Sequence, residues 1–250
     1  MKVNEVLKHW IEFIFPSNLT CYFCEKELHP ESKNVLCSSC EEEIVINDTQ
    51  QCIKCGRTLD LVYSQHADYF YKCKDCQEKF TFFTKHKSFG VYSGNLKTAI
   101  IGLKYKKQIY QARYFGEQLA MMIQKDESLS DFDLIIPVPI HFSRRMARGY
   151  NQAERIAFFM SKKLETRPPL ELLQRRRHTK KLKNLNKASR KAMLENAIIV
   201  KRHKKEFVRG QKVLLVDDIY TTGATLDACS KALYEAGCSQ INCITVARGV

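Results

Sequence analysis

Between residues 85 and 250, short apolar runs alternate with longer segments whose apolar positions recur every three or four residues. The short runs are typical of buried strands, and the longer segments are typical of helices that cover a sheet. Strands are expected over residues 88–92, 133–140, 170–173, 197–200, 213–216 and 241–247. Helices are expected over residues 95–103, 112–125, 151–163 and 225–236. This alternation predicts an α/β domain built on a mostly parallel, open sheet.

The first 84 residues follow a different pattern and predict two further parts. Val3, Leu7, Trp10 and Ile14 recur at helical spacing, and Pro16 ends the pattern. This predicts a docking helix within residues 1–18 that packs its apolar face on the body of the protein. Residues 19–84 are instead rich in cysteine and form a separate small module, so that the α/β domain begins at residue 85.

The module contains four Cys-x-x-Cys pairs. Its eight cysteines are Cys21, Cys24, Cys37, Cys40, Cys52, Cys55, Cys73 and Cys76. Two such pairs supply four thiolates on tight turns, which is the ligand set of a closed structural Zn²⁺ site. Gly56, directly after Cys55, suits a turn that needs a positive φ. The sequence predicts two zinc sites. Pairing in sequence order is the simplest arrangement, but the first pair could also share a metal with the third.

The sequence also bounds the location of the protein. It has no run of eighteen apolar residues, so no membrane span is expected. Glu5, His9 and Glu12 interrupt the first segment, which excludes a signal peptide. We therefore expect a cytoplasmic protein, where thiols stay reduced and eleven cysteines favour metal binding over disulfides.

The formal charge of +14 is concentrated in one segment. Residues 174–209 contain 14 Lys and Arg residues against Glu195 and Glu206, and so account for +12 of it. Residues 174–191 have weak periodicity and no acidic residue, which predicts a mobile loop or a marginal helix. Basic side chains bind the phosphates of nucleic acid. The candidates for that contact are Arg175, Arg176, Arg177, Lys180 and Lys181.

Residues 213–225 carry the clearest candidate site. Asp217 and Asp218 follow an apolar strand, at the edge where open α/β sheets bind ligands. Hydroxyl groups and accessible backbone amides come next, at the start of a helix, and such groups bind phosphate. They belong to Thr221, Thr222, Gly223, Ala224 and Thr225. Ionised carboxylates only accept hydrogen bonds, so the acids suit sugar hydroxyls. The segment predicts a sugar-phosphate site.

This segment resembles, at all thirteen positions, the phosphoribosyl-pyrophosphate (PRPP) motif of type I phosphoribosyltransferases. The resemblance implies that Asp217 and Asp218 hold the ribose hydroxyls of PRPP or a related ribose 5-phosphate. It implies that the turn over residues 221–225 holds the 5′-phosphate. The fold expected from it is the type I phosphoribosyltransferase fold, preceded here by the zinc-ribbon module.

A second loop, over residues 141–150, follows a predicted strand and should open on the same edge of the sheet. Arg144, Arg145 and Arg148 bring fixed positive charge to that edge. A pyrophosphate group, bound together with Mg²⁺, is the natural partner for them. Which of the three arginines points inward is left open by the sequence.

Over essentially the whole chain, these blocks together resemble the ComF family of late-competence proteins. The matching segments are Leu103-Lys-Tyr, Arg148-Gly-Tyr-Asn-Gln-Ala, Arg177-His-Thr and the PRPP motif, which follow the cysteine module in that order. The resemblance implies a cytoplasmic protein that works with a DNA-translocating helicase in the uptake of single-stranded DNA during natural transformation.

Two main functions follow from these features. The first is an enzyme that transfers ribose 5-phosphate from PRPP to an unknown acceptor, with the basic loop closing over the site. The second is a protein that binds single-stranded DNA along the basic segment. A zinc-bearing adaptor for the helicase is a third possibility, and it would require neither site.

Overall fold

The computed structural model describes residues 20–29, 32, 35–46, 51–59, 72–176 and 197–249. The docking helix expected within residues 1–18 lies outside the described residues. So do Arg177, Lys180, Lys181 and most of the basic loop.

Four parallel strands form the central sheet, in the order β1-β6-β5-β2. They are β1 (Lys85–Val91), β2 (Leu134–Pro137), β5 (Lys212–Tyr220) and β6 (Gln240–Arg248). A separate antiparallel ribbon pairs β3 (Leu173–Arg175) with β4 (Ile198–Val200). The expected parallel α/β sheet is therefore present.

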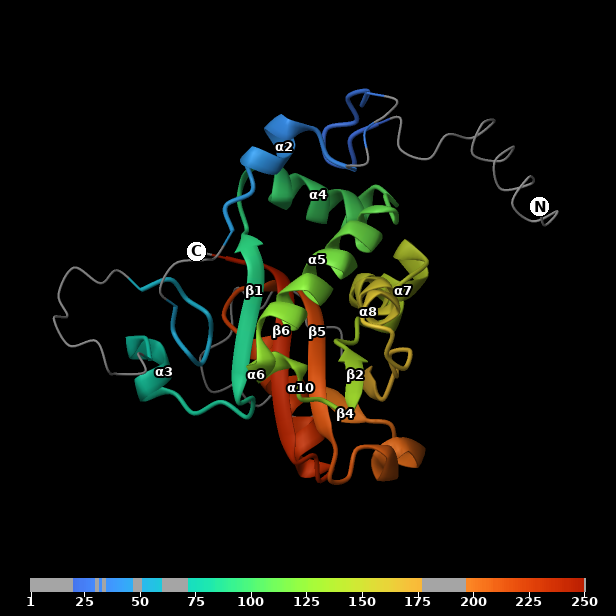
Figure 1. Cartoon of the computed structure of the whole chain (residues 1–250). Coiled ribbons are helices and arrows are strands. Elements are labelled where there is room, and N and C mark those ends of the chain that lie inside the picture. The colour runs from blue at the N-terminus through green and yellow to red at the C-terminus, as the bar shows by residue number, and fades with distance from the viewer. Residues whose placement is uncertain are drawn as a thin grey trace, which may run out of the picture.

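Alternating residues of β5 and β6 point into two separate apolar cores. Leu214, Val216 and Ile244 pack in one core with the helices α4 (Gly94–Tyr105), α5 (Gln111–Lys125) and α8 (Gln152–Lys163). Val213, Leu215 and Cys243 pack in the other with α10 (Ala224–Glu235). Figure 1 shows α5 crossing in front of the sheet. Helices thus cover both faces, as buried parallel strands require.

Short elements complete the fold. The cysteine module contains α2 (Ser38–Glu42) and α3 (Lys74–Glu78). The connection between α5 and β2 contains α6 (Glu127–Ser130), and α7 (Phe142–Arg148) follows β2. The 3₁₀ helix η1 (Arg202–Phe207) leads from β4 to β5.

Several sequence-based boundaries were wrong. The strand expected over residues 133–140 ends at Pro137, because Pro139 has no N–H to extend the pairing. Strand β5 does not end at Val216 but runs to Tyr220, because the equally long β6 pairs with it as far as Arg248. The expected loop over residues 141–150 contains the helix α7, whose N-cap His141 accepts a hydrogen bond from the Ser143 amide. Strand β3 begins later than expected and includes Gln174 and Arg175, the first residues of the presumed basic loop.

Candidate functional site

The carboxyl end of β5 is open on one side because its neighbour β2 is shorter. Strand β2 ends at Pro137, opposite Val216, whereas β5 continues for four more residues. The Val138 amide still donates to the Val216 carbonyl at 2.9 Å, but Pro139 has no N–H to extend the pairing. Space therefore remains beside Asp217 and Asp218 where another strand residue would otherwise lie.

A cavity of about 290 Å³, which we call the β5 cavity, occupies this space. Its walls come from β5, the loop after β2, α4, α7, α8, β3 and the start of α10. It is lined by Lys104, Tyr105, Val138, Pro139, Ile140, Arg144, Arg148, Gln152, Arg175, Asp217, Asp218, Ile219, Thr221 and Thr225. Both predicted acids, two of the predicted arginines and two of the predicted threonines thus meet around one volume.

Asp218 is 4 % exposed and faces a cation from another element. Its Oδ2 atom lies 3.0 Å from Lys104 Nζ, at the end of α4, without forming a hydrogen bond of ordinary geometry. An ion pair so little exposed to water depends strongly on both partners, because removing one leaves the other charge buried. The pair also leaves acceptor capacity on the carboxylate for a ligand hydroxyl.

Asp217 is 8 % exposed, and its Oδ1 atom accepts a hydrogen bond from the Asp218 amide at 2.8 Å. Burial raises the pKa of Asp217 to about 8, and the neighbouring Asp218 charge adds to the increase. Lys104 and Arg175 act in the opposite direction but do not cancel it. Asp217 therefore holds its proton at neutral pH until a ligand brings donors or positive charge.

The turn after β5 leads directly into a helix. Gly223 has φ +75° and is the N-cap of α10, and a Cβ at this position would lie 2.4 Å from the Tyr220 hydroxyl. Thr221 and Thr225 line the β5 cavity, whereas Thr222 and Ala224 are exposed on the same turn. The amides at the start of a twelve-residue helix thus adjoin the cavity, where they favour an anion.

The three predicted arginines of α7 separate into two groups. Arg144 and Arg148 line the β5 cavity. Arg145 instead pairs with Glu171 at 2.7 Å and with Glu154 at 3.2 Å, and it lines a different cavity. The helical conformation of α7 causes this division, because successive residues of a helix point in different directions.

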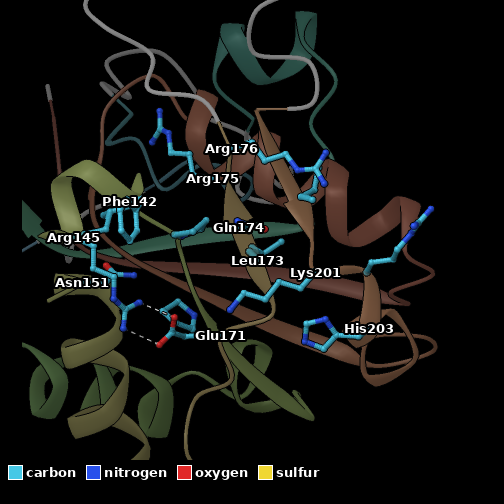
Figure 2. A pocket seen from close by; sticks show the side chains of 15 residues that line it. Phe142, Arg145, Asn151, Glu171, Leu173, Gln174, Arg175, Arg176, Lys201 and His203 are labelled. Carbon is cyan, nitrogen blue, oxygen red and sulfur yellow. Dashed lines mark hydrogen bonds and ion pairs between the residues drawn. The ribbon is translucent and has the colours of Figure 1, made fainter.

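Lys104 and Arg175 were not predicted at this site. Lys104 lies in the Leu103-Lys-Tyr segment that resembles the ComF family, and this was the available signal. Arg175 was predicted as a nucleic-acid contact, but it is half-buried and lines the β5 cavity. Burial and the neighbouring Arg144 lower its pKa, while Asp217 acts to raise it. Of the remaining nucleic-acid candidates, only Arg176 lies within the described residues. It lines the cavity that Arg145 also lines (Figure 2).

The eight cysteines of the module form two groups of four. Cys21, Cys24, Cys37 and Cys40 make one group, and Cys52, Cys55, Cys73 and Cys76 make the other. Within each group the sulfur atoms all lie within 4.8 Å of one another. The pairing is therefore the sequential one, and the interleaved arrangement that the sequence left open is excluded.

Both groups fit a tetrahedral metal ion. The Sγ atoms of Cys24 and Cys37, and those of Cys55 and Cys73, are 3.7 Å apart. Four thiolates at the Zn–S distance of about 2.3 Å would have edges of about 3.8 Å. The two turns are also alike: Glu25 and Gly56 have φ of 61° and 67°, and their amides donate to the carbonyls of Cys21 and Cys52. Each group could hold one metal ion.

The second cysteine group is connected to the turn at Gly223 through buried side chains. The Cys55 carbonyl accepts hydrogen bonds from His86 Nδ1, at 2.9 Å, and from the Arg248 guanidinium. Burial lowers the pKa of His86 to about 3, so its ring is neutral. Both side chains stack on Tyr220, His86 at 4.2 Å and Arg248 at 4.5 Å from the ring centre. Tyr220 in turn is the residue packed against Gly223.

Comparison with known proteins places this arrangement in a family. A family model described as a phosphoribosyl transferase domain matches residues 152–249, which include the acids and the turn. Competence protein F of Haemophilus influenzae is 31 % identical over 234 residues, covering 92 % of this chain and 97 % of that protein. The chain belongs to the ComF family.

Further ComF-family relatives match over similar lengths. Competence protein ComFC of Bacillus subtilis is 25 % identical and covers 88 % of this chain and 90 % of its own length. The DNA utilization protein YhgH of Escherichia coli strain K12 is 25 % identical, with 88 % and 93 % covered. Within the residues of this protein that the structure describes, no helix is both long enough and apolar enough to cross a membrane.

Proposed function

We propose that this chain is a cytoplasmic competence protein that binds PRPP with Mg²⁺ in the β5 cavity and acts in the uptake of single-stranded DNA. The observation that carries the PRPP part is the meeting of buried acids, cations and a phosphate-type turn around one cavity. The competence and DNA-utilization names of its relatives, and the basic segment over residues 174–209, support the DNA part.

In this proposal each group of residues has one task. Asp217 and Asp218 accept hydrogen bonds from the ribose hydroxyls, and Lys104 lies against Asp218 on the other side. The turn from Thr221 to Thr225 binds the 5′-phosphate through amides and hydroxyls. Arg144 and Arg148 face the pyrophosphate, whose charge Mg²⁺ would further neutralise. The two cysteine groups would each bind Zn²⁺ and so stabilise a module too small for a core of its own.

Calorimetry with PRPP–Mg²⁺ and with a short single-stranded DNA, each alone and then together, tests both parts. The native chain should bind each ligand. Asp218→Asn should weaken PRPP binding by roughly 10- to 100-fold, because a charged hydrogen bond contributes about 1.5–3 kcal/mol, and should leave DNA binding unchanged. Asp131→Asn is the matched control, since Asp131 is exposed and lies near the opposite end of the sheet. Unchanged PRPP affinity in Asp218→Asn would contradict the site assignment.

A second candidate is transfer of the phosphoribosyl group to an acceptor. The observation that favours it is a second, larger cavity that shares a wall with the β5 cavity and so offers space for another reactant. In such a reaction the bond from ribose C1 to pyrophosphate breaks, a bond from C1 to the acceptor forms, and pyrophosphate leaves between Arg144 and Arg148. Release of pyrophosphate that requires an added acceptor, and is lost in Asp218→Asn, would establish this activity.

A further inference from the structure

A second cavity, of about 470 Å³, lies between α7 and the β3–β4 ribbon, and we call it the ribbon cavity (Figure 2). Its lining includes Phe142, Arg145, Glu171, Arg176, Lys201 and Arg202. Figure 2 shows Arg145 joined to Glu171 at one end of the cavity, with Lys201 and Arg176 on the side of the ribbon. Apart from the space that it offers for an acceptor, the proposed function gives this cavity no ligand.

The cations of the ribbon cavity are of two kinds. Arg145 is neutralised, since it pairs with both Glu171 and Glu154. Arg176, Lys201 and Arg202 form no ion pair with any carboxylate in the part of the chain that the structure describes. Lys201 is near enough to Glu171 to help lower the pKa of that carboxyl, but the cations that line the cavity outnumber this one carboxylate, so the field there attracts an anion. The chemistry therefore favours a ligand with at least one phosphate group over a neutral heterocycle.

The same cavity has an apolar side. Phe142, the first residue of α7, is 70 % exposed although it is a large aromatic residue. Leu173 and Ile199, from the two strands of the ribbon, also line the cavity. An exposed ring that lines the same cavity as several cations is a combination that can stack a base while its phosphate is bound. A simple inorganic anion would not need this apolar surface.

The two cavities share part of their wall. Pro139, Ile140 and Arg175 line both of them. Arg175 also lies near enough to Asp217 and Arg144 to affect and be affected by their charges. A ligand in the ribbon cavity would therefore lie beside a ligand in the β5 cavity, with Arg175 between them.

We propose that the ribbon cavity binds a nucleotide, with its base on Phe142 and its phosphate against Arg176, Lys201 and Arg202. The nucleotide is either free or one unit of a single-stranded DNA, because both present the same base and phosphate. This proposal adds a binding site to the DNA-binding part of the proposed function. It rests on that part only where the nucleotide is one unit of a single-stranded DNA.

The test measures binding of two probes, dAMP by calorimetry and a fluorescent eight-nucleotide oligodeoxyadenylate by anisotropy. Phe142→Ala and the double variant Lys201→Gln/Arg202→Gln should each weaken binding at least fivefold. Matched controls lie on α8: Phe158→Ala removes another exposed aromatic ring, and Lys162→Gln/Lys163→Gln removes two exposed charges. Both controls should bind as the native chain does. In Lys201→Gln/Arg202→Gln, the salt dependence of oligonucleotide binding should also decrease, by the amount expected for the loss of roughly one to two phosphate contacts. Phe142→Ala should leave the salt dependence unchanged.

The two probes distinguish the sources. If the variants bind only dAMP more weakly, the ligand is a free nucleotide. If they bind the oligonucleotide more weakly, alone or together with dAMP, the ligand is a single-stranded DNA. Equal affinity of all variants for both probes would overturn the proposal. Loss of dAMP binding in Asp218→Asn but not in Phe142→Ala would also overturn it, because the nucleotide would then lie in the β5 cavity. PRPP–Mg²⁺ affinity should be unchanged in Phe142→Ala, which separates this test from that of the proposed function.

Discussion

At the scale of single residues, Asp217 shows how a buried carboxylic acid acts against stability. Burial and the adjacent Asp218 raise its pKa to about 8, from an ordinary value of 3.8. The native state therefore retains a proton that the unfolded state releases above about pH 4. The free energy of unfolding must then fall as pH rises from about 4 to 8, and this residue makes its largest unfavourable contribution above that range.

Asp217→Asn should for this reason stabilise the ligand-free protein. Asn resembles the protonated acid, so the free energy of unfolding at pH 8 should increase by at least about 1 kcal/mol. The gain should disappear near pH 3, where the acid is protonated in both the folded and the unfolded state. Urea unfolding at the two pH values measures it, with Asp131→Asn as the exposed control. A gain of equal size at both pH values would contradict the assigned cause.

At the scale of elements, the contact between α5 and α8 holds the helix layer against the sheet. Gly116 lies at this contact, and a Cβ there would be 2.7 Å from both the Ile156 carbonyl oxygen and the Met160 amide nitrogen. Both atoms belong to the backbone, so they cannot move aside as the end of a side chain can. Helix α8 in turn contacts β5 and β2, the strands that form the carboxyl edge of the site.

Gly116→Ala should push the two helices apart and destabilise the protein by about 1–3 kcal/mol, as overpacking of a tight core does. Met121→Ala is the control on the same helix, because Met121 is exposed and its loss should change the free energy of unfolding by less than about 0.5 kcal/mol. Thermal or urea unfolding measures both. A Gly116→Ala variant as stable as the native chain would show that the helices can separate freely.

The sequence predicted those elements whose signal is local. Residues 213–225 could be recognised because an apolar run, two acids and a glycine-containing turn follow one another within thirteen positions. The four-residue error at the end of β5 has a long-range cause, since β6 determines how far pairing continues. Lys104 was missed for the same reason, because its partner Asp218 is far away in the sequence. Spacing also could not decide how the cysteine pairs combine.

At the scale of the whole molecule, the two cysteine groups belong to different cores. Cys21, Cys40 and Phe23 pack in the core of α4 and α5, where Phe23 contacts the rings of Tyr114 and Phe115. Cys52 and Cys55 pack in the core of α10. Only the second group, among the described residues, reaches Tyr220 and the turn at Gly223 through the Cys55 carbonyl. A metal ion in the second site should therefore support Tyr220 and the turn after it, whereas a metal ion in the first site should not.

This difference can be tested with one cysteine from each group. Cys24→Ser and Cys76→Ser should each lower the bound zinc from two ions to one and lower the melting temperature, because a structural metal contributes to folding. Only Cys76→Ser should weaken PRPP–Mg²⁺ binding, by roughly threefold or more, a coupling of about 0.7 kcal/mol. A colorimetric zinc assay, thermal melting and calorimetry give the three values. Equal PRPP affinity in the two variants would show that the connection through Arg248 and Tyr220 carries no coupling.

The early end of β2 has a consequence for how this protein can change. The β5 cavity exists because one strand is shorter than its neighbour, and Pro139 keeps it short. The opening therefore needs no bent or strained backbone in the sheet itself. Many of the side chains that line it project from α4, α7 and the ribbon, outside the four-stranded framework. Substitutions of these side chains can change which molecule binds in the cavity while the four-stranded sheet stays intact. Ligand selectivity and the stability of the fold can therefore change largely independently of each other.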